Sequence, residues 1–344
     1  MHREARLAVL RKNIKYRGST FSPDGSRVIY VARQRERSFL VDGDKESARY
    51  EEVNLPNFLS DGTCYYYTVR REGRWYLLMG ADELDGGYES LRDVSASPDG
   101  RTFAYTFWEN NRDYVRIAGT RCGNEFDGAW SPRFSPDGRT SAYVANKGLQ
   151  FFIMKGDAPL RTFEQVLFPV FSPDGRVAYP ARRGDRWFLE VEEEIVTPEY
   201  DAIEHPVFSA NGRTMAYAAE RAGIWFAVFK GREGSGYTLV TELALNPQGT
   251  RLAYRGASQA EHLVVDDVPG TPFELVLEPV WSPDGSRLAF IGDTPRERRL
   301  YVGGKKSDPL LEIRSHRFTT DGSGVEFGAL QGKELWWKVM PVEA

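Results

Sequence analysis

A repeat of about 37 residues constrains the fold of this chain more than any other feature of its sequence. The stretch FSPDGSRVIYVA, which begins at Phe21, recurs as FSPDGRTSAYVA from Phe134 and as WSPDGSRLAFIG from Trp281. Nine copies align on a glycine, and successive glycines lie 36 to 38 residues apart: Gly25, Gly62, Gly100, Gly138, Gly175, Gly212, Gly249, Gly285 and Gly322. A fixed period of this length is typical of repeat architectures.

The residues around each glycine have the composition of a tight turn. Asp precedes the glycine in seven copies, and Asn211 and Gln248 replace it in the other two; Pro stands two residues before the glycine in six copies. Proline presets the φ angle of a turn, Asp bonds the nearby backbone, and Gly accepts a left-handed conformation. We therefore expect one hairpin in each copy and a structural role for the turn aspartates.

Large apolar side chains flank these turns at fixed distances. Four residues before the glycine stand Phe21, Phe58, Phe134, Phe171, Phe208, Leu245, Trp281 and Phe318, with Ala96 as the exception. About five residues after it stand Tyr30, Tyr67, Tyr105, Tyr143, Tyr179, Tyr217, Tyr254, Phe290 and Phe327. We expect these aromatic side chains to lie between stacked sheets.

One period divides into four short strands. In FSANGRTMAYAAERAGIWFAVFKGREGSGYTLVTELAL, short apolar segments alternate with turns, and we find no apolar stripe with helical spacing. Four-stranded sheets repeated at this period are the blades of a β-propeller. The sequence therefore predicts an all-β protein with a single propeller domain over residues 1–344.

The number of blades depends on how the ring closes. The ninth copy has segments for three strands, and the chain then ends at Ala344 without an outer strand. The N-terminal segment ARLAVLRKNI precedes the first inner strand and has no other partner. We predict that it supplies the missing strand and closes nine blades; the alternative is eight blades with one irregular terminal copy.

At the level of the repeat the chain resembles the TolB-like propellers of the WD40-like class. The repeat of that class carries a W/F-S-P-D-G-x-x-I/L-A-F/Y core, which WSPDGSRLAF from Trp281 matches, and the resemblance extends over nearly the whole chain. It implies a propeller but no single function, because such blades occur in scaffolds, in periplasmic partner proteins and in the gating domains of serine peptidases. The sequence has no G-x-S-x-G nucleophile motif and no residues left over for a peptidase domain.

Composition excludes several classes of protein. The net charge of −4 is too small to indicate generic nucleic-acid binding, and no apolar run approaches the length of a signal peptide core or a membrane span. We therefore expect a cytoplasmic protein without a membrane anchor, or a periplasmic or secreted one if a leader was removed. Cys64 and Cys122 lie at unrelated phases of the repeat, so no disulfide is expected.

We expect no metal, no cofactor and no catalytic residue. One turn acid per blade cannot converge on a single ion, and His205 and His316 belong to blades three apart. The residues five before each glycine, interpreted as the starts of the inner strands, contain no carboxylate or imidazole. Four tryptophans at one repeated position are expected to pack in the core: Trp75, Trp187, Trp225 and Trp336.

Two other tryptophans break the pattern of the repeat. We place Trp108 in the turn between the second and third strands of the third blade, and Trp130 in the approach to the next inner strand. These positions predict neighbouring contact residues on one face, with Arg112 and Arg133 nearby. Local packing of long loops is the alternative interpretation.

The same face carries arginine-rich turns. In the first two blades the turn between the second and third strands contains Arg33, Arg35, Arg37, Arg70, Arg71 and Arg74, and the fifth blade repeats the pattern with Arg182, Arg183 and Arg186. Turns on the opposite face, near Asp42 and Glu192, are acidic. The pattern indicates either a docking surface for an anionic partner or ordinary solvated hairpin tips.

Three classes of function agree with these features. The leading hypothesis is a non-enzymatic binding scaffold for a protein or another anionic macromolecule, with the arginines and Trp108, Arg112, Trp130 and Arg133 as its contact residues. The second is a hydrolase or lyase with a pocket built from loops at the mouth of the channel. The third, a regulatory or self-assembling partner of another chain, is not separated from the first by sequence.

Overall fold

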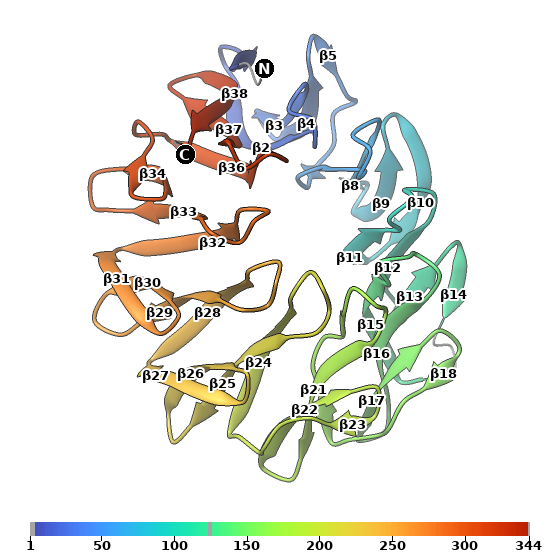
Figure 1. The fold of residues 1–344 in the computed structure, drawn as a ribbon. Helices are drawn as coiled ribbons and strands as arrows, with labels where there is room; N and C mark the ends of the chain where they lie inside the picture. The colour runs from blue at the N-terminus through green and yellow to red at the C-terminus, as the bar shows by residue number, and fades with distance from the viewer. Residues whose placement is uncertain (1–3, 123–125, 343–344) are drawn as a thin grey trace.

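The described part of the chain, residues 4–122 and 126–342 of a computed structural model, forms nine antiparallel sheets arranged in a ring (Figure 1). Each sheet is one blade, and blades are numbered here in chain order. The prediction of a nine-bladed propeller is confirmed, and the eight-bladed alternative is wrong. Within these residues no helix is long and apolar enough to span a bilayer.

The strands of the first five blades follow the repeat. Blade 1 contains β2 (Lys15–Phe21), β3 (Val28–Gln34), β4 (Arg37–Asp42) and β5 (Lys45–Glu46). Blade 2 contains β6 (Glu52–Val53), β7 (Asn57–Phe58), β8 (Tyr65–Arg71), β9 (Arg74–Met79) and β10 (Asp82–Tyr88). Blade 3 contains β11 (Ser90–Ala96), β12 (Phe103–Glu109), β13 (Arg112–Ile117) and β14 (Thr120–Cys122). Blade 4 contains β15 (Gly128–Phe134), β16 (Ser141–Lys147), β17 (Gln150–Lys155) and β18 (Ala158–Pro159). Blade 5 contains β19 (Gln165–Val166), β20 (Val170–Phe171), β21 (Val177–Arg183), β22 (Arg186–Val191) and β23 (Glu194–Ile195).

The last four blades complete the ring. Blade 6 contains β24 (Ala202–Phe208), β25 (Met215–Arg221), β26 (Ile224–Phe229) and β27 (Arg232–Tyr237). Blade 7 contains β28 (Leu239–Leu245), β29 (Leu252–Ala257), β30 (Glu261–Val265) and β31 (Val268–Phe273). Blade 8 contains β32 (Leu275–Trp281), β33 (Leu288–Asp293), β34 (Arg298–Val302) and β35 (Lys305–Lys306). Blade 9 contains β36 (Glu312–Phe318), β37 (Gly324–Gln331), β38 (Glu334–Pro341) and the N-terminal β1 (Ala5–Val9).

The N-terminal strand closes the ring as the sequence predicted. β1 pairs antiparallel with β38, with Ala5 opposite Trp337 and Val9 opposite Glu334, and Figure 1 shows the blue N-terminal segment beside the red β38. The Leu10 N–H donates to the Lys333 carbonyl at 2.7 Å. Without β1, the outer edge of β38 would present unpaired backbone groups.

Strand direction places the turns on two faces of the disc. Because neighbouring strands are antiparallel, the turns after the first and third strands of a blade lie on one face, and the turn after the second strand lies on the other. We call the first the turn face, since it carries the nine glycine turns. We call the second the tip face, since it carries the arginine-rich tips.

Aromatic side chains fill the space between blades, as expected. Tyr30, Tyr179 and Tyr254 are each at most 2% exposed. Trp75, Trp187 and Trp225 pack partly buried against the clusters between blades. Trp336 differs, because it lies half-buried outside these clusters and its Nε1–H donates to Glu334 at 3.1 Å.

Ala96 is the one small residue among the apolar residues that stand four before each turn glycine, and a large residue of the neighbouring blade compensates for it. The residue just before the buried aromatic is Ala in six copies of the repeat, but in blade 2 it is Tyr66. Tyr66 belongs to the same core cluster as Ala96 and makes an edge contact with Phe103, with ring centroids 5.2 Å apart. A small residue and a large residue have exchanged places across this interface.

The turn aspartates have the structural role that the sequence predicted. In blade 1, Asp24 accepts hydrogen bonds from the Ser22 hydroxyl at 2.6 Å and from the Ser26 N–H at 3.1 Å, while Ser22 Oγ accepts from the Arg27 N–H at 2.9 Å. The Ser22 hydroxyl is the main reason why the pKa of Asp24 falls to about 2.

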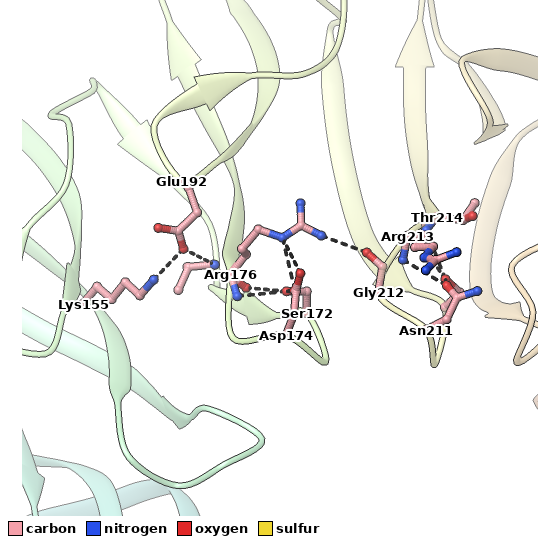
Figure 2. Close-up of polar contacts among 11 residues, drawn as sticks. Lys155, Ser172, Asp174, Arg176, Glu192, Asn211, Gly212, Arg213 and Thr214 are labelled. Carbon is pink, nitrogen blue, oxygen red and sulfur yellow. Dashed lines mark hydrogen bonds and ion pairs between the residues drawn. The ribbon is translucent and has the colours of Figure 1, made fainter.

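Hydrogen bonds also join successive turns across blades. In Figure 2 the Arg176 Nε–H donates to Asp174, while its Nη2–H donates to the Gly212 carbonyl in the next blade at 2.8 Å. Asn211 continues the series, because its Nδ2–H reaches the Gln248 carbonyl of blade 7 at 3.0 Å. The turn face is therefore bonded from blade to blade around this part of the ring.

Replacing Asp137 with Ala should lower the melting temperature slightly at neutral pH and leave the fold intact. Asp137 accepts from the Ser135 hydroxyl at 2.6 Å and from the Arg139 N–H, and these bonds lower its pKa from 3.8. A lowered pKa in the folded state stabilises the fold above pH 4 and ceases to do so as the aspartate is protonated at lower pH. Thermal melts at pH 7 and pH 2 should therefore differ between the proteins only at pH 7; an equal difference at both would contradict the role of the carboxylate.

Candidate binding surfaces

The arginine-rich tips of blades 1 and 2 lie side by side on the tip face. β3 ends at Gln34 and β4 begins at Arg37, and the equivalent turn of blade 2 follows Arg71. The two blades share a core cluster that includes Ile29, Tyr67 and Val69. Equivalent turns of packed neighbouring blades emerge on the same face, so the two tips are neighbours on the tip face.

Internal carboxylates neutralise much of this charge. The shortest nitrogen to oxygen distances are 3.1 Å for Arg33 with Glu36, 3.7 Å for Arg70 with Glu51, 3.1 Å for Arg71 with Glu83 and 3.6 Å for Arg74 with Glu89. Exposed pairs of this kind contribute little to stability and exchange readily with other ions. The tip of blade 2 is consequently less cationic than its sequence indicates.

Arg35 and Arg37 differ from the other four arginines. Both residues are exposed, and neither forms an ion pair with any residue in 4–122 or 126–342. Arg35 occupies the turn itself with a left-handed backbone at φ 54°. These two guanidinium groups are therefore the ones on the blade 1 tip most accessible to an external anion.

The arginines at the tip of blade 5 contact blade 5 itself and the connection to blade 6. Arg186 pairs with Asp201, while Arg182 lies over the Trp187 ring at 5.9 Å and Arg183 over the Phe188 ring at 5.5 Å. The guanidinium planes cover aromatic surface here, and such contacts restrict them. We therefore do not group this tip with those of blades 1 and 2.

The acidic turns of the turn face are also paired. Asp42 lies 2.9 Å from Arg27, and Glu192 lies 2.6 Å from Lys155 of the preceding blade, as Figure 2 shows for the second pair. Ion pairs on both faces reduce the charge difference between them.

The positions predicted for Trp108 and Trp130 are wrong in detail. Trp108 lies within β12, where it pairs with Ser90 and Asp113, and Trp130 lies within the inner strand β15, opposite Val144. Both strands extend further than the turn signals indicated. The Trp130 ring contacts Phe151 and packs on the core between blades 4 and 5, so it turns away from blade 3 and does not form a contact surface with Trp108.

Arg112 and Arg133 lie in different environments. Arg112 begins β13 on the tip face, 4.0 Å from Asp127. Arg133 lies in β15 and lines a hollow at the inner strands of blades 2 to 5. The sequence placed these arginines together, and the structure separates them because Arg133 belongs to a strand that faces the axis of the ring.

The inner strands carry ionisable residues that the sequence interpretation missed. Most inner strands begin before the position five residues ahead of the glycine; β28, for example, starts at Leu239 and not at Ala244. Seven of the nine contain a β-bulge at which the residue seven before the glycine has a positive φ angle: Gly18, Asp93, Ser131, His205, Glu242, Glu278 and Ser315. A bulge inserts one residue, so counting by strict alternation failed here.

Some of these residues contact one another across blades. Glu242 accepts from the Glu278 N–H at 3.1 Å, and Glu278 lies 3.4 Å from Nδ1 of the buried His316. The contact with His316 is the main cause of the lowered pKa of Glu278. His205 pairs instead with Glu204 at 3.2 Å. Among the described residues, no group of three or more His, Cys, Asp or Glu is arranged to hold a metal ion.

Comparison with known proteins assigns no family to this chain. No family model matches the chain, and no curated protein matches it in sequence. A structure of the Dos1 propeller is similar, with a TM-score of 0.49 and 10% identity over 98% of this chain and 94% of that one. A crystal structure of the eukaryotic initiation factor gives 0.46 and 9% over 98% and 90%. TolB from Acinetobacter baumannii gives 0.35 and 12% over 84% and 79%. These likenesses are structural only.

Proposed function

We propose that this protein is a non-enzymatic binding scaffold that docks an acidic segment of a partner protein on the tips of blades 1 and 2. The observation that supports this most directly is the exposure of Arg35 and Arg37 without an internal carboxylate, next to the arginine-rich tip of blade 2. Guanidinium groups bind carboxylates through paired hydrogen bonds. A rigid ring of packed blades holds the two tips at a fixed separation.

The pairing of the other arginines is compatible with this function. Arg71 and Arg74 hold their carboxylate partners at exposed positions, with roughly half of each side chain accessible to solvent. An incoming acidic segment can replace such partners, because exposed ion pairs have a net free energy of about 0–1 kcal/mol. Arg35 and Arg37 would make the first contacts, and the tip of blade 2 would extend the surface.

Reversing two charges on the tip face should weaken binding of an acidic polymer. We expect Arg35→Glu with Arg37→Glu to reduce the affinity for fluorescently labelled poly-L-glutamate about tenfold or more, a change of roughly 1.4 kcal/mol. Fluorescence anisotropy at 50 mM and 300 mM NaCl measures the affinity and its dependence on salt, which should weaken binding because it screens exposed charges.

The matched control carries the same change in charge on the other face. Arg139→Glu with Arg213→Glu alters two exposed arginines of the turn face and should leave the affinity nearly unchanged. If both double variants bind equally weakly, net charge alone governs binding and the tips are ordinary solvated turns. Binding that is indifferent to salt would also contradict the proposal.

A hydrolase or lyase built at the mouth of the channel is the second candidate. The observation that favours it is the series of ionisable residues at the bulges, since Asp93, His205, Glu242 and Glu278 all belong to inner strands. Catalysis of either kind needs such groups within hydrogen-bond reach of one substrate. Loss of a measured hydrolytic or lyase activity on Glu242→Gln, with poly-L-glutamate binding intact, would favour this candidate over the scaffold.

A further inference from the structure

A hollow lies against the inner strands of blades 2 to 5, away from the arginine tips. Its volume is about 720 Å³, and its wall includes Phe58, Phe134, Phe171 and Val170. Ser60, Pro98 and Pro136 also line it, which places it at the turn-face end of these strands. Sites for small molecules commonly have volumes of about 300–1,000 Å³, with apolar walls and a few polar groups.

Arg133 is the cationic residue among those that line this hollow. Its Nη1–H donates to the Pro132 carbonyl at 2.9 Å, which fixes one side of the guanidinium. The residue is exposed, and it makes no ion pair with any residue that the structure describes. The other N–H groups of this guanidinium are therefore accessible to solvent, while most of the residues around them in the hollow are apolar.

The chain itself provides a comparison for this arginine. Arg317 occupies the same position of the repeat in blade 9, five residues before the glycine. There the residue directly opposite on the next strand is Glu326, and its carboxylate lies 2.9 Å from Arg317. The residue opposite Arg133 is Ala142. Blade 9 thus provides a carboxylate for Arg317, whereas blade 4 provides none for Arg133.

We propose that the hollow binds a small organic carboxylate with a flat apolar body, and that Arg133 binds its carboxylate group. The ligand carboxylate would take the place that Glu326 holds in blade 9. Its apolar body would lie against Phe134 and Phe171, where contact with aromatic rings removes apolar surface from water. This site is separate from the arginine tips and does not depend on the function proposed for them.

Asp93 also lines the hollow and bears on the charge of the ligand. Its Oδ2 accepts from the Thr106 hydroxyl at 3.1 Å, and it forms no ion pair with Arg133. Its negative charge opposes an anionic ligand without contacting the guanidinium. Neutralising it with Asp93→Asn should therefore raise the affinity for a carboxylate, whereas a positively charged ligand would bind less well.

Two probes of similar shape separate the contribution of the carboxylate charge to binding from the contribution of the apolar ring. We expect wild-type protein to bind naphthalene-2-carboxylate more tightly than the neutral naphthalene-2-methanol in isothermal titration calorimetry. Arg133→Gln should weaken the carboxylate about tenfold, the loss expected for a charge-assisted hydrogen bond, and change the alcohol little. Val170→Trp should weaken both probes, because it narrows the hollow beside Arg133.

Arg139→Gln is the matched control, since this arginine lies in the same blade on the exposed glycine turn. It should leave both affinities unchanged, and circular dichroism melts verify that each variant is folded. The proposal is overturned if wild-type protein binds neither probe, if Arg133→Gln and Arg139→Gln have equal effects, or if Asp93→Asn weakens the carboxylate. Poly-L-glutamate binding to Arg133→Gln tests the tips separately and should equal that of wild type.

Discussion

Deleting residues 1–12 should lower the free energy of unfolding by more than about 3 kcal/mol and reduce solubility. The deletion removes β1 and with it the pairing that closes blade 9. It also removes Leu7 and Leu10, which pack on the core between blades 9 and 1. Lost burial of two large apolar side chains and lost backbone hydrogen bonds together account for this magnitude. Denaturant titration followed by tryptophan fluorescence measures it.

A shorter deletion provides the control. Because β1 begins at Ala5, removing residues 1–4 leaves the paired strand whole and should leave the unfolding midpoint unchanged. The exposed edge of β38 in the longer deletion should also promote association between chains, which light scattering detects. An unchanged midpoint after the longer deletion would show that a three-stranded last blade is sufficient.

The fold could be predicted from the sequence because the residues that form the turn and the buried aromatic position recur nine times along the chain. The turn at Asp24 and Gly25, and the aromatic residue at Tyr30, recur with a spacing that only one kind of sheet repeat satisfies. Closure followed from counting, since the last copy had three strands and the N-terminal segment had none to pair with. A single exceptional copy does not change this prediction. Ala96 is such an exception, and Tyr66 compensates for it across the blade interface.

The candidate sites were harder to predict because they depend on departures from the repeat. A bulge near the start of the inner strand places Glu242 at a left-handed residue, and alternation gives no sign of it. The turn signals place Trp130 in a loop, but β15 begins at Gly128 and includes it.

Pairing between distant residues was equally invisible in the sequence. Arg71 and Glu83 are twelve residues apart and meet only when the blade is folded. The number of arginines in the sequence therefore overestimates the unpaired positive charge at the tips. Only the folded structure distinguishes Arg35 and Arg37 from the arginines that form ion pairs.

Replacing Trp337 with Ala should destabilise the protein by about 3–5 kcal/mol, the usual range for a buried large aromatic side chain. Trp337 is 4% exposed and lies in β38, opposite Ala5 of the closing strand. Its ring centroid is 5.9 Å from that of Phe21 in blade 1. Gly25 makes room for it, since a Cβ atom there would lie 2.1 Å from the indole. One side chain thus joins the last blade, the first blade and the turn of the first repeat.

The neighbouring tryptophan gives a control with the same change in composition. Trp336 is half-buried, with its indole N–H bonded to Glu334 and Lys338 over its ring at 5.2 Å. Successive residues of a strand face opposite sides of the sheet, so Trp336 points away from the interface that Trp337 fills. Trp336→Ala should therefore cost less than half as much in denaturant titration. Equal costs would mean that the junction between blades 9 and 1 is no more tightly packed than the half-buried surroundings of Trp336, and the ring would then be closed mainly by the backbone pairing of β1.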